Sequence, residues 1–215
     1  MEITWYGHSC FRISERGMAS VVTDPYDHEE VGYAPLKLKA EIVTVSCDMP
    51  GHNFLKGVNR GAMTITGPGE YEVGGVFITG VQTNGHKKKS EEMPNTLYVI
   101  DYGKITVAHL GEVTRVPSQA EIETLGTVNI ALVPIGDYSS LNASKAAEVV
   151  SLIEPNIVIP MHYATSTSKM KLDPLAKFLK EMGLTQLETM DSFKVTNASN
   201  LPEETKVVVL DVRTS

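Results

Sequence analysis

The order of secondary-structure patterns along the chain is the feature that most constrains its fold. The first half consists of short runs rich in β-branched and aromatic residues, separated by turn-forming residues, and such runs predict strands. They cover residues 3–6, 11–13, 19–23, 41–46, 63–66, 76–81, 96–101 and 105–109. In the second half, helices predicted at 118–126, 143–153 and 173–183 alternate with strands predicted at 129–134, 157–161 and 206–212. This order is typical of an α/β sandwich of two mixed β-sheets with outer helices.

Composition narrows the class of protein further. The chain has 215 residues, of which 42% are hydrophobic, and it shows no linker, repeat or low-complexity tract, so we expect a single domain over residues 1–215. A net charge of −7 argues against nucleic-acid and anionic-membrane partners. The basic run 87–89 is followed at once by Glu91 and Glu92, which indicates a solvated loop.

The two cysteines and the absence of a targeting pattern indicate the cellular compartment in which we expect the protein. Cys10 and Cys47 lie far apart in the sequence, and neither a signal peptide nor a long apolar run is present. We therefore expect a reducing, cytoplasmic environment and free thiols.

Several segments resemble, in order, one known family. They are Ile-Thr-Trp-Tyr-Gly-His-Ser-Cys-Phe-Arg-Ile at 3–13, Thr-Asp-Pro at 23–25, Gly-Pro-Gly-Glu-Tyr at 67–71, the stretch 95–112, and Pro-Met-His-Tyr at 160–163. The ordered set is similar to the metallo-β-lactamase superfamily, in the branch of metal-dependent hydrolases related to ascorbate-6-phosphate lactonases. The resemblance runs from about residue 2 to about residue 210. It implies a four-layer αββα sandwich with the site at one edge, between the sheets.

The metal signature of that family, H-x-H-x-D-H, is largely lost in this chain. Its place is taken by Cys-Asp-Met-Pro-Gly-His at 47–52, so Cys47, Met49 and Gly51 stand at eroded positions and only His52 remains. By the same resemblance, His86 matches the third-motif histidine, although its neighbours differ, and His162 matches the final one. Glu112 takes the place of an aspartate that bridges two metals in relatives.

Transferred residue by residue, the family's ligands give two unequal metal sets. His52, Glu112 and His162 form the more credible remnant, because two imidazoles and a carboxylate suffice for one zinc, manganese or ferrous ion. Glutamate is one methylene longer than aspartate, so its carboxylate is expected to be displaced from the position of the aspartate carboxylate. Cys47, Met49 and His86 form a soft set suited to copper(I) or zinc. For Cys47 and Met49 the simpler interpretation is that they are buried apolar residues filling a vacated pocket.

Other polar residues near these motifs have two interpretations each. His8, at a strand end, is either a general acid or base or a hydrogen-bonded core residue. Asp24 is expected to orient a ligand, with a turn carboxylate as the alternative. His109 is expected to orient a neighbour. Asp48 is expected to point away from the metals. Asp137 is expected to cap a turn, with a contact to a bound ligand as the alternative.

Two functional hypotheses follow. The sequence favours a descendant whose dinuclear site is eroded and which is non-catalytic or binds a ligand, since three of the four signature positions are lost together. The alternative is a hydrolase of a small ester, lactone or phosphoester that uses one remnant metal. The expected cofactor is accordingly none or one divalent metal, zinc or manganese. The expected partner is a small-molecule ligand or substrate, and a homo-oligomer stays open.

Overall fold

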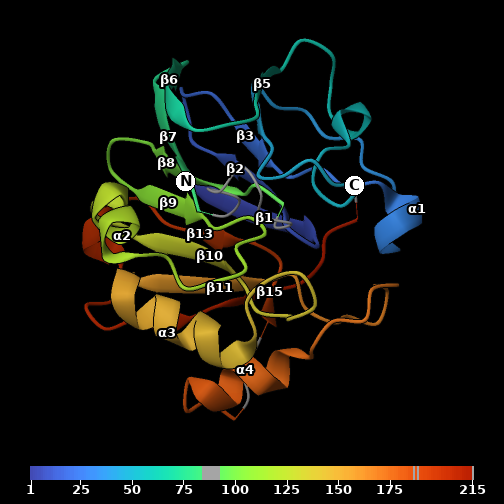
Figure 1. The fold of residues 1–215 in the computed structure, drawn as a ribbon. Helices are drawn as coiled ribbons and strands as arrows, with labels where there is room; N and C mark the ends of the chain where they lie inside the picture. Colours follow the sequence, from blue (N-terminus) through green and yellow to red (C-terminus); the bar gives the residue numbers. More distant parts are fainter. Residues whose placement is uncertain (84–92, 186, 188, 215) are drawn as a thin grey trace.

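Two β-sheets packed face to face form the centre of the molecule in the computed structural model, which describes residues 1–83, 93–185, 187 and 189–214 (Figure 1). The first sheet has the order β13-β1-β2-β3-β4-β5. Its strands are β1 (Glu2–Gly7), β2 (Cys10–Ser14), β3 (Val21–Thr23), β4 (Ile42–Thr44), β5 (Met63–Ile65) and β13 (Phe193–Lys194). Pairing is antiparallel from β13 to β3 and parallel from β3 to β5, so the sheet is mixed.

The second sheet has the order β14-β11-β10-β9-β8-β7-β6 and is also mixed. Its strands are β6 (Gly69–Val73), β7 (Val76–Gln82), β8 (Thr96–Asp101), β9 (Thr106–His109), β10 (Ile130–Pro134), β11 (Ile157–Met161) and β14 (Lys206–Val207). The strands β9, β10, β11 and β14 pair in parallel, and the others pair antiparallel. A small parallel pair is formed by β12 (Thr189–Met190) and β15 (Val209–Leu210).

Helices complete the outer layers. They are α1 (His28–Val31), α2 (Gln119–Leu125), α3 (Ala143–Ile153) and α4 (Leu175–Glu181), with 3₁₀ turns at Leu55–Gly57 and Ala198–Asn200. In Figure 1, α3 and α4 lie together on the outer side of the second sheet, and α3 contacts both α4 and β10. The predicted capping pair Ser118 and Glu121 forms a complete capping box at the start of α2.

The strands of the first sheet are apolar on both faces because the sheet separates two hydrophobic clusters. Val21 and Ile42 pack into the cluster between the sheets, whereas their neighbours Val22 and Val43 pack into a second cluster under segment 26–58. Successive side chains of a strand point to opposite faces, so both clusters draw on the same strands. The predicted α/β sandwich of two mixed sheets is confirmed. On the first sheet, however, the outer layer consists mainly of irregular chain with the short helix α1.

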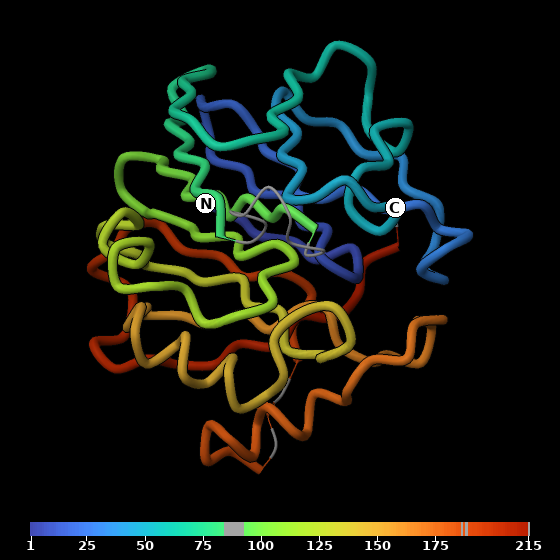
Figure 2. The backbone as a smooth tube through the Cα atoms, viewed as in Figure 1, coloured from blue at the N-terminus to red at the C-terminus, as the bar shows by residue number. Residues whose placement is uncertain are grey.

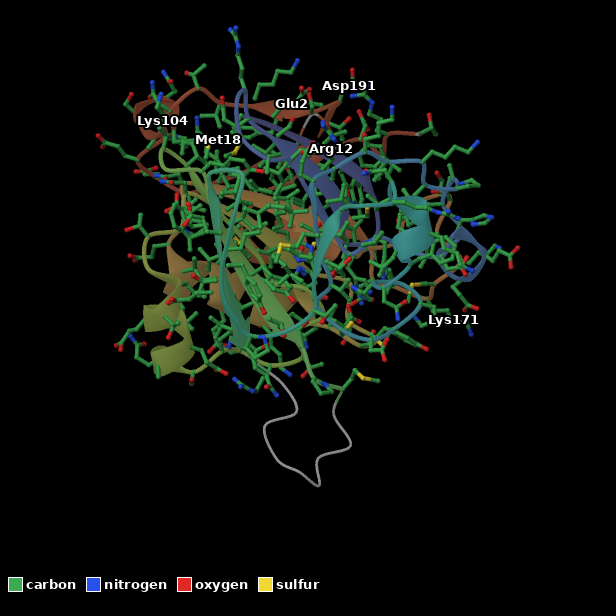
Figure 3. All side chains as sticks on the ribbon, turned by 90° about the horizontal axis from the view of Figure 1, so that it is seen from above. Glu2, Arg12, Met18, Lys104, Lys171 and Asp191 are labelled. Carbon is green, nitrogen blue, oxygen red and sulfur yellow. The ribbon has the colours of Figure 1, made fainter. Side chains whose placement is uncertain are left out.

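A segment near the C-terminal end of the chain pairs with the first strand. Figure 2 shows the C-terminal part, in red, running back to the first sheet, where β13 pairs with β1 through Ile3 and Phe193. The view in Figure 3 places the labelled charged residues Glu2, Lys104, Lys171 and Asp191 at the periphery of the molecule.

A few elements differ from the sequence prediction. The edge strand β6 and the one-turn helix α1 were not predicted, because glycine and glutamate are poor strand formers and a single helical turn has no periodicity. The strand predicted at 206–212 is divided, since β14 joins β11 in the second sheet and β15 joins β12. Cys10 and Cys47 are free thiols, as expected. Within the described ranges, no helix combines the length and apolar composition that crossing a bilayer requires.

The direction of the strands decides where functional side chains gather. Since β1 and β3 are both antiparallel to β2, and β3 and β4 are parallel, the carboxyl ends of β1, β3 and β4 meet at one edge of the first sheet. The carboxyl ends of β9, β10 and β11 likewise share one edge of the second sheet. Loops that follow such strand ends are the usual place for ligands in α/β proteins.

Candidate metal centre

Three histidines from three different loops converge at this edge. His8 follows β1, His52 lies in the loop after β4, and His162 follows β11. Each is at most 1% exposed, and they offer ring nitrogens that all lie within 4.8 Å of one another. The ring centre of His8 is 4.9 Å from that of His52 and 4.3 Å from that of His162. The predicted convergence of His52 and His162 is confirmed by a distance of 6.2 Å between their ring centres.

The backbone at this edge is held in an uncommon conformation. His8, Asp24 and His162 have φ of 51°, 38° and 53°, in the left-handed region that residues other than glycine rarely adopt. The carbonyl oxygen of His8 accepts hydrogen bonds from Trp5 Nε1 at 3.0 Å and from the backbone N–H of His162 at 3.1 Å, which joins the two sheets at the site. Strained backbone of this kind collects at functional sites, where surrounding structure maintains it.

Gly136 makes the close approach at His162 possible. A Cβ atom at this position would lie 2.0 Å from the carbonyl oxygen of His162, which is far inside contact distance. Glycine after β10 is therefore required by the loop that carries His162.

A buried carboxylate fixes the ring of His52. Asp24 Oδ2 is 2.8 Å from His52 Nδ1, and the two Asp24 oxygens also accept hydrogen bonds from the N–H and the hydroxyl of Ser46 at 2.7 and 2.6 Å. Burial alone would lower the pKa of His52, but the neighbouring Cys47 and the Asp24 carboxylate more than offset this, and the pKa lies well above its usual value. Because a carboxylate only accepts hydrogen bonds, His52 Nδ1 carries a proton. Nε2 is then the atom that faces the point where the three histidines converge, called the centre below. The predicted orienting position of Asp24 agrees with this contact.

Ser140 contacts the ring of His162 as Asp24 contacts the ring of His52. Its hydroxyl oxygen is 3.1 Å from His162 Nδ1, on the far side of the ring from the centre. Burial lowers the pKa of His162, so its imidazole is neutral at pH 7. Both His52 and His162 thus present Nε2 to the same point while Nδ1 is held from outside, which is the arrangement of metal-ligating histidines.

Glu112 reaches the same point, despite its extra methylene. Its Oε2 lies 3.3 Å from His52 Nε2 and 3.4 Å from His162 Nε2. Its Oε1 accepts a hydrogen bond from the Ser139 hydroxyl. Burial raises the pKa of Glu112, but the two imidazoles lower it to about 2, which keeps this side chain ionised.

The His8 ring differs from the rings of the other two histidines. Within the described part of the chain, neither of its buried nitrogens has a hydrogen-bond partner. Burial lowers the pKa of His8 well below its usual range, so the ring is neutral. An imidazole buried in this way forfeits its hydrogen bonds to water, at a cost of about 1–3 kcal/mol per unsatisfied group. A ligand at the centre would supply what the ring lacks.

The residues present fit one metal ion. In a tetrahedral site with metal–nitrogen distances of about 2.0–2.1 Å, ligand atoms lie about 3.3 Å apart. The two separations between imidazole Nε2 and Glu112 Oε2 match this value, and they exceed the roughly 2.7–2.9 Å of a charge-assisted hydrogen bond. Three imidazoles and one carboxylate form a set that borderline divalent metals prefer.

The eroded positions lie beside this centre. Cys47 is buried, as expected, with its sulfur 3.9 Å from Ser46 Oγ, and burial raises the pKa of its thiol, which keeps it protonated. Met49 is only half-buried and belongs to neither hydrophobic cluster, so its predicted burial is wrong. Asp48 is exposed and bonds Asn53, away from the centre as expected. His86 and the basic run 87–89 lie outside the described residues.

The remaining candidates have structural contacts. The backbone carbonyl of Asp137 accepts the N–H of Ser140 at 3.1 Å, which closes the expected turn. His109 Nε2 is 2.9 Å from the carbonyl oxygen of Ser9 and 4.0 Å from Asp24 Oδ2. His109 is therefore packed behind the centre, where it supports the chain around Asp24.

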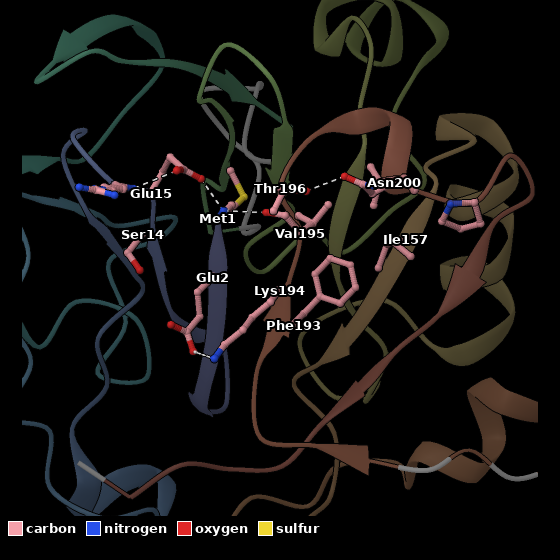
Figure 4. A pocket seen from close by; sticks show the side chains of 13 residues that line it. Met1, Glu2, Ser14, Glu15, Ile157, Phe193, Lys194, Val195, Thr196 and Asn200 are labelled. Carbon is pink, nitrogen blue, oxygen red and sulfur yellow. Dashed lines mark hydrogen bonds and ion pairs between the residues drawn. The ribbon is translucent and has the colours of Figure 1, made fainter.

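Two cavities differ in their relation to the centre. One of about 530 Å³ is lined by Cys47, Asp48 and Thr96 among others, so it adjoins the loop that carries His52. A larger one of about 740 Å³ lies at the opposite edge, between the start of β1 and the start of β11. Figure 4 shows its lining charges, Glu2 with Lys194 and Glu15 with the N-terminus, paired with one another. Of these two cavities, the first lies on the side of the molecule where the three histidines converge.

Comparison with known proteins agrees with the two-sheet fold and with a site at the edge where the three histidines converge. A family model described as the β-lactamase superfamily domain matches residues 2–162. A protein of the metallo-β-lactamase superfamily from Thermotoga maritima, of known structure, is 33% identical, with a TM-score of 0.77 and 97% of each chain covered. The chain belongs to the metallo-β-lactamase superfamily. Its resemblance to that superfamily, stated from sequence motifs, is confirmed.

Other superfamily members extend the relationship. A UPF0173 protein from Pyrococcus furiosus is 30% identical over 85% of this chain and 90% of its own length. A UPF0173 metal-dependent hydrolase from Thermoplasma acidophilum is 26% identical over 77% of this chain and 84% of its own length. Within this superfamily, the three clustered histidines form a group that could hold a divalent metal.

The sequence did not single out His8 as a member of the ligand group. Its place after β1 and the missing side chain at Gly51 are each visible in the sequence. Only the structure shows that the two positions adjoin.

Proposed function

We propose that the chain is a metal-dependent hydrolase that works with one divalent ion, held by His8, His52 and His162 together with Glu112. The observation that carries this proposal is the convergence of three buried imidazoles. Two of them are held from outside through Nδ1, and the third has no hydrogen-bond partner in the part of the chain that the structure describes. A site that had only been vacated would be expected to fill with apolar groups, because unsatisfied buried polar groups destabilise the fold. The geometry thus supports the second of the two sequence hypotheses.

The chemistry follows from the superfamily and from the donor set. A bound divalent ion lowers the pKa of a coordinated water and polarises a carbonyl or phosphoryl oxygen. Zinc can take a fifth ligand, so four protein donors leave room for water. The relative from Thermoplasma acidophilum bears the name metal-dependent hydrolase, which supports the same class of reaction on a small ester, lactone or phosphoester.

Each residue of the site has a role in this proposal. Glu112 supplies the negative charge that offsets the cation. Its low pKa suits a ligand better than a general base, which works best near neutral pKa. Asp24 and Ser140 hold the Nδ1 atoms of His52 and His162, which directs their Nε2 atoms toward the metal. The nitrogen-rich set favours zinc over manganese.

Metal content tests the proposal first. Metal-free protein is titrated with zinc, and binding is compared between the wild type and His162→Ala, with Asp48→Asn as a control on the exposed side of the signature loop. We expect one ion per wild-type chain and a loss of at least about tenfold in affinity for His162→Ala. A wild type that binds no zinc would show that the site is vacated.

Activity is tested on the zinc-loaded protein with nitrophenyl esters, a lactone and an activated phosphodiester. We expect hydrolysis of one class that is lost on chelation and is weak in His162→Ala. Stoichiometric zinc without any such hydrolysis would favour the non-catalytic, ligand-binding hypothesis.

A further inference from the structure

Position 51 and the ring of His8 compete for the same space. A Cβ atom on Gly51 would lie 2.8 Å from His8 Nε2 and 3.3 Å from His8 Cδ2, with Val31 next at 3.6 Å. The backbone at Gly51 does not require glycine, because its φ is outside the left-handed region. Glycine is therefore needed here for room.

The His8 ring cannot easily move aside. It is 1% exposed, and the rings of His52 and His162 pack against it. Its backbone is fixed on both sides by the hydrogen bonds of its carbonyl oxygen to Trp5 and His162. A side chain at position 51 would push the ring out of the cluster or be excluded by it.

In this geometry, a side chain at position 51 and the ring of His8 would reach the same coordination position of a bound metal ion. A side chain at position 51 would point at Nε2 of His8, the imidazole that offers one ring nitrogen within 4.8 Å of those of His52 and His162. A carboxylate at position 51 would thus approach the centre from the place that the imidazole now fills. That imidazole comes from another loop, and its ring has no hydrogen-bond partner among the described residues.

We propose that His8 serves as the third metal ligand in place of a carboxylate at position 51, with Gly51 as the positioning residue that leaves room for it. This inference rests on the proposed function, since it assigns the ligands of the same centre. The exchange replaces an anionic oxygen with a neutral nitrogen. Imidazole suits zinc, whereas carboxylate ligands suit manganese, so the exchange raises selectivity for zinc over manganese.

The first experiment compares two glycine substitutions. Gly51→Ala adds a methyl group against His8, whereas Gly67→Ala adds one where no atom of the described residues lies within 4 Å, and neither glycine has left-handed φ. Zinc affinity is measured by competition with a chromophoric chelator, and circular dichroism of the metal-free proteins checks their folding. We expect Gly51→Ala to lose about 10–100-fold in zinc affinity, as disturbed ligand positioning does elsewhere, and Gly67→Ala to match the wild type.

The second experiment restores a ligand from the other loop. His8→Gly keeps the left-handed backbone and empties the space, and the double variant His8→Gly/Gly51→Asp places a carboxylate there. We expect His8→Gly to bind zinc at least about tenfold more weakly and the double variant to recover part of that loss. The ratio of zinc to manganese affinity should fall at least about tenfold from the wild type to the double variant.

The outcomes separate this inference from the proposed function. A wild type that takes up no zinc overturns both. A wild type that binds zinc, with Gly51→Ala and His8→Gly binding equally tightly, leaves the metal centre in place and overturns the ligand exchange alone. A double variant that stays as weak as His8→Gly, or that binds zinc with unchanged selectivity, also contradicts the exchange.

Discussion

Replacing Asp24 with asparagine should weaken metal binding by changing the tautomer of His52. The Asp24 carboxylate has no exposed surface, and its hydrogen bonds within the described residues come from Ser46 and His52. In Asp24→Asn the amide oxygen can keep the Ser46 N–H, which leaves the amide NH₂ facing His52 Nδ1. That nitrogen must then accept, so the His52 proton moves to Nε2, the atom that faces the centre.

The expected losses of metal affinity and of stability follow from the hydrogen bonds that Asp24→Asn removes. Loss of an outer partner of a ligating histidine costs about 10–100-fold in metal affinity, or about 1.4–2.7 kcal/mol. The metal-free protein should also lose about 1.5–3 kcal/mol of unfolding free energy for the charge-assisted hydrogen bond. Chelator competition gives the first quantity and urea unfolding in the presence of chelator gives the second.

The control for this substitution lies in the same signature loop. Asp48 is exposed, and its carboxylate accepts a hydrogen bond from the amide of Asn53, at a distance from the three histidines, so Asp48→Asn should keep wild-type zinc affinity and stability. If folded Asp24→Asn bound zinc within about twofold of the wild type, the assignment of Nε2 of His52 as a ligand atom would be wrong.

Two further predictions concern the other histidines. Burial lowers the pKa of His8, so the metal-free fold excludes a proton that the unfolded chain takes up below about pH 6.5. Unfolding free energy should therefore fall with decreasing pH less steeply in His8→Gly than in the wild type, by up to about 1.4 kcal/mol per pH unit in urea titrations; equal slopes would mean that His8 titrates normally. Ser140→Ala removes the partner of His162 Nδ1 and should weaken zinc binding about tenfold, with unchanged affinity contradicting an orienting contact.

The sequence predicted the fold well because its periodic patterns are local. Most strands of the two sheets and the helices α2, α3 and α4 have strong periodicity, caps or turn residues of their own. The short strands β12 and β13 lack such signals and owe their formation to pairing with distant strands. Their prediction would have required the tertiary structure.

The candidate site could be predicted only in part, for a related reason. Motif order placed His52, Glu112 and His162 together, and the structure brings them together. The signature showed that a carboxylate is missing at Gly51. It could not show that His8, from a separate loop, fills the space beside Gly51, because that proximity depends on how the loops after β1 and β4 pack against each other.

The ligands of the bound ion are the most direct test of the central claim. X-ray absorption at the zinc edge, on protein reconstituted with one equivalent of zinc, reports the ligand atoms and their distances. The account predicts nitrogen and oxygen ligands at about 2.0–2.1 Å, with outer scattering from three imidazoles and no sulfur. A sulfur shell at about 2.3 Å would place Cys47 in the site and contradict the assignment of the three histidines.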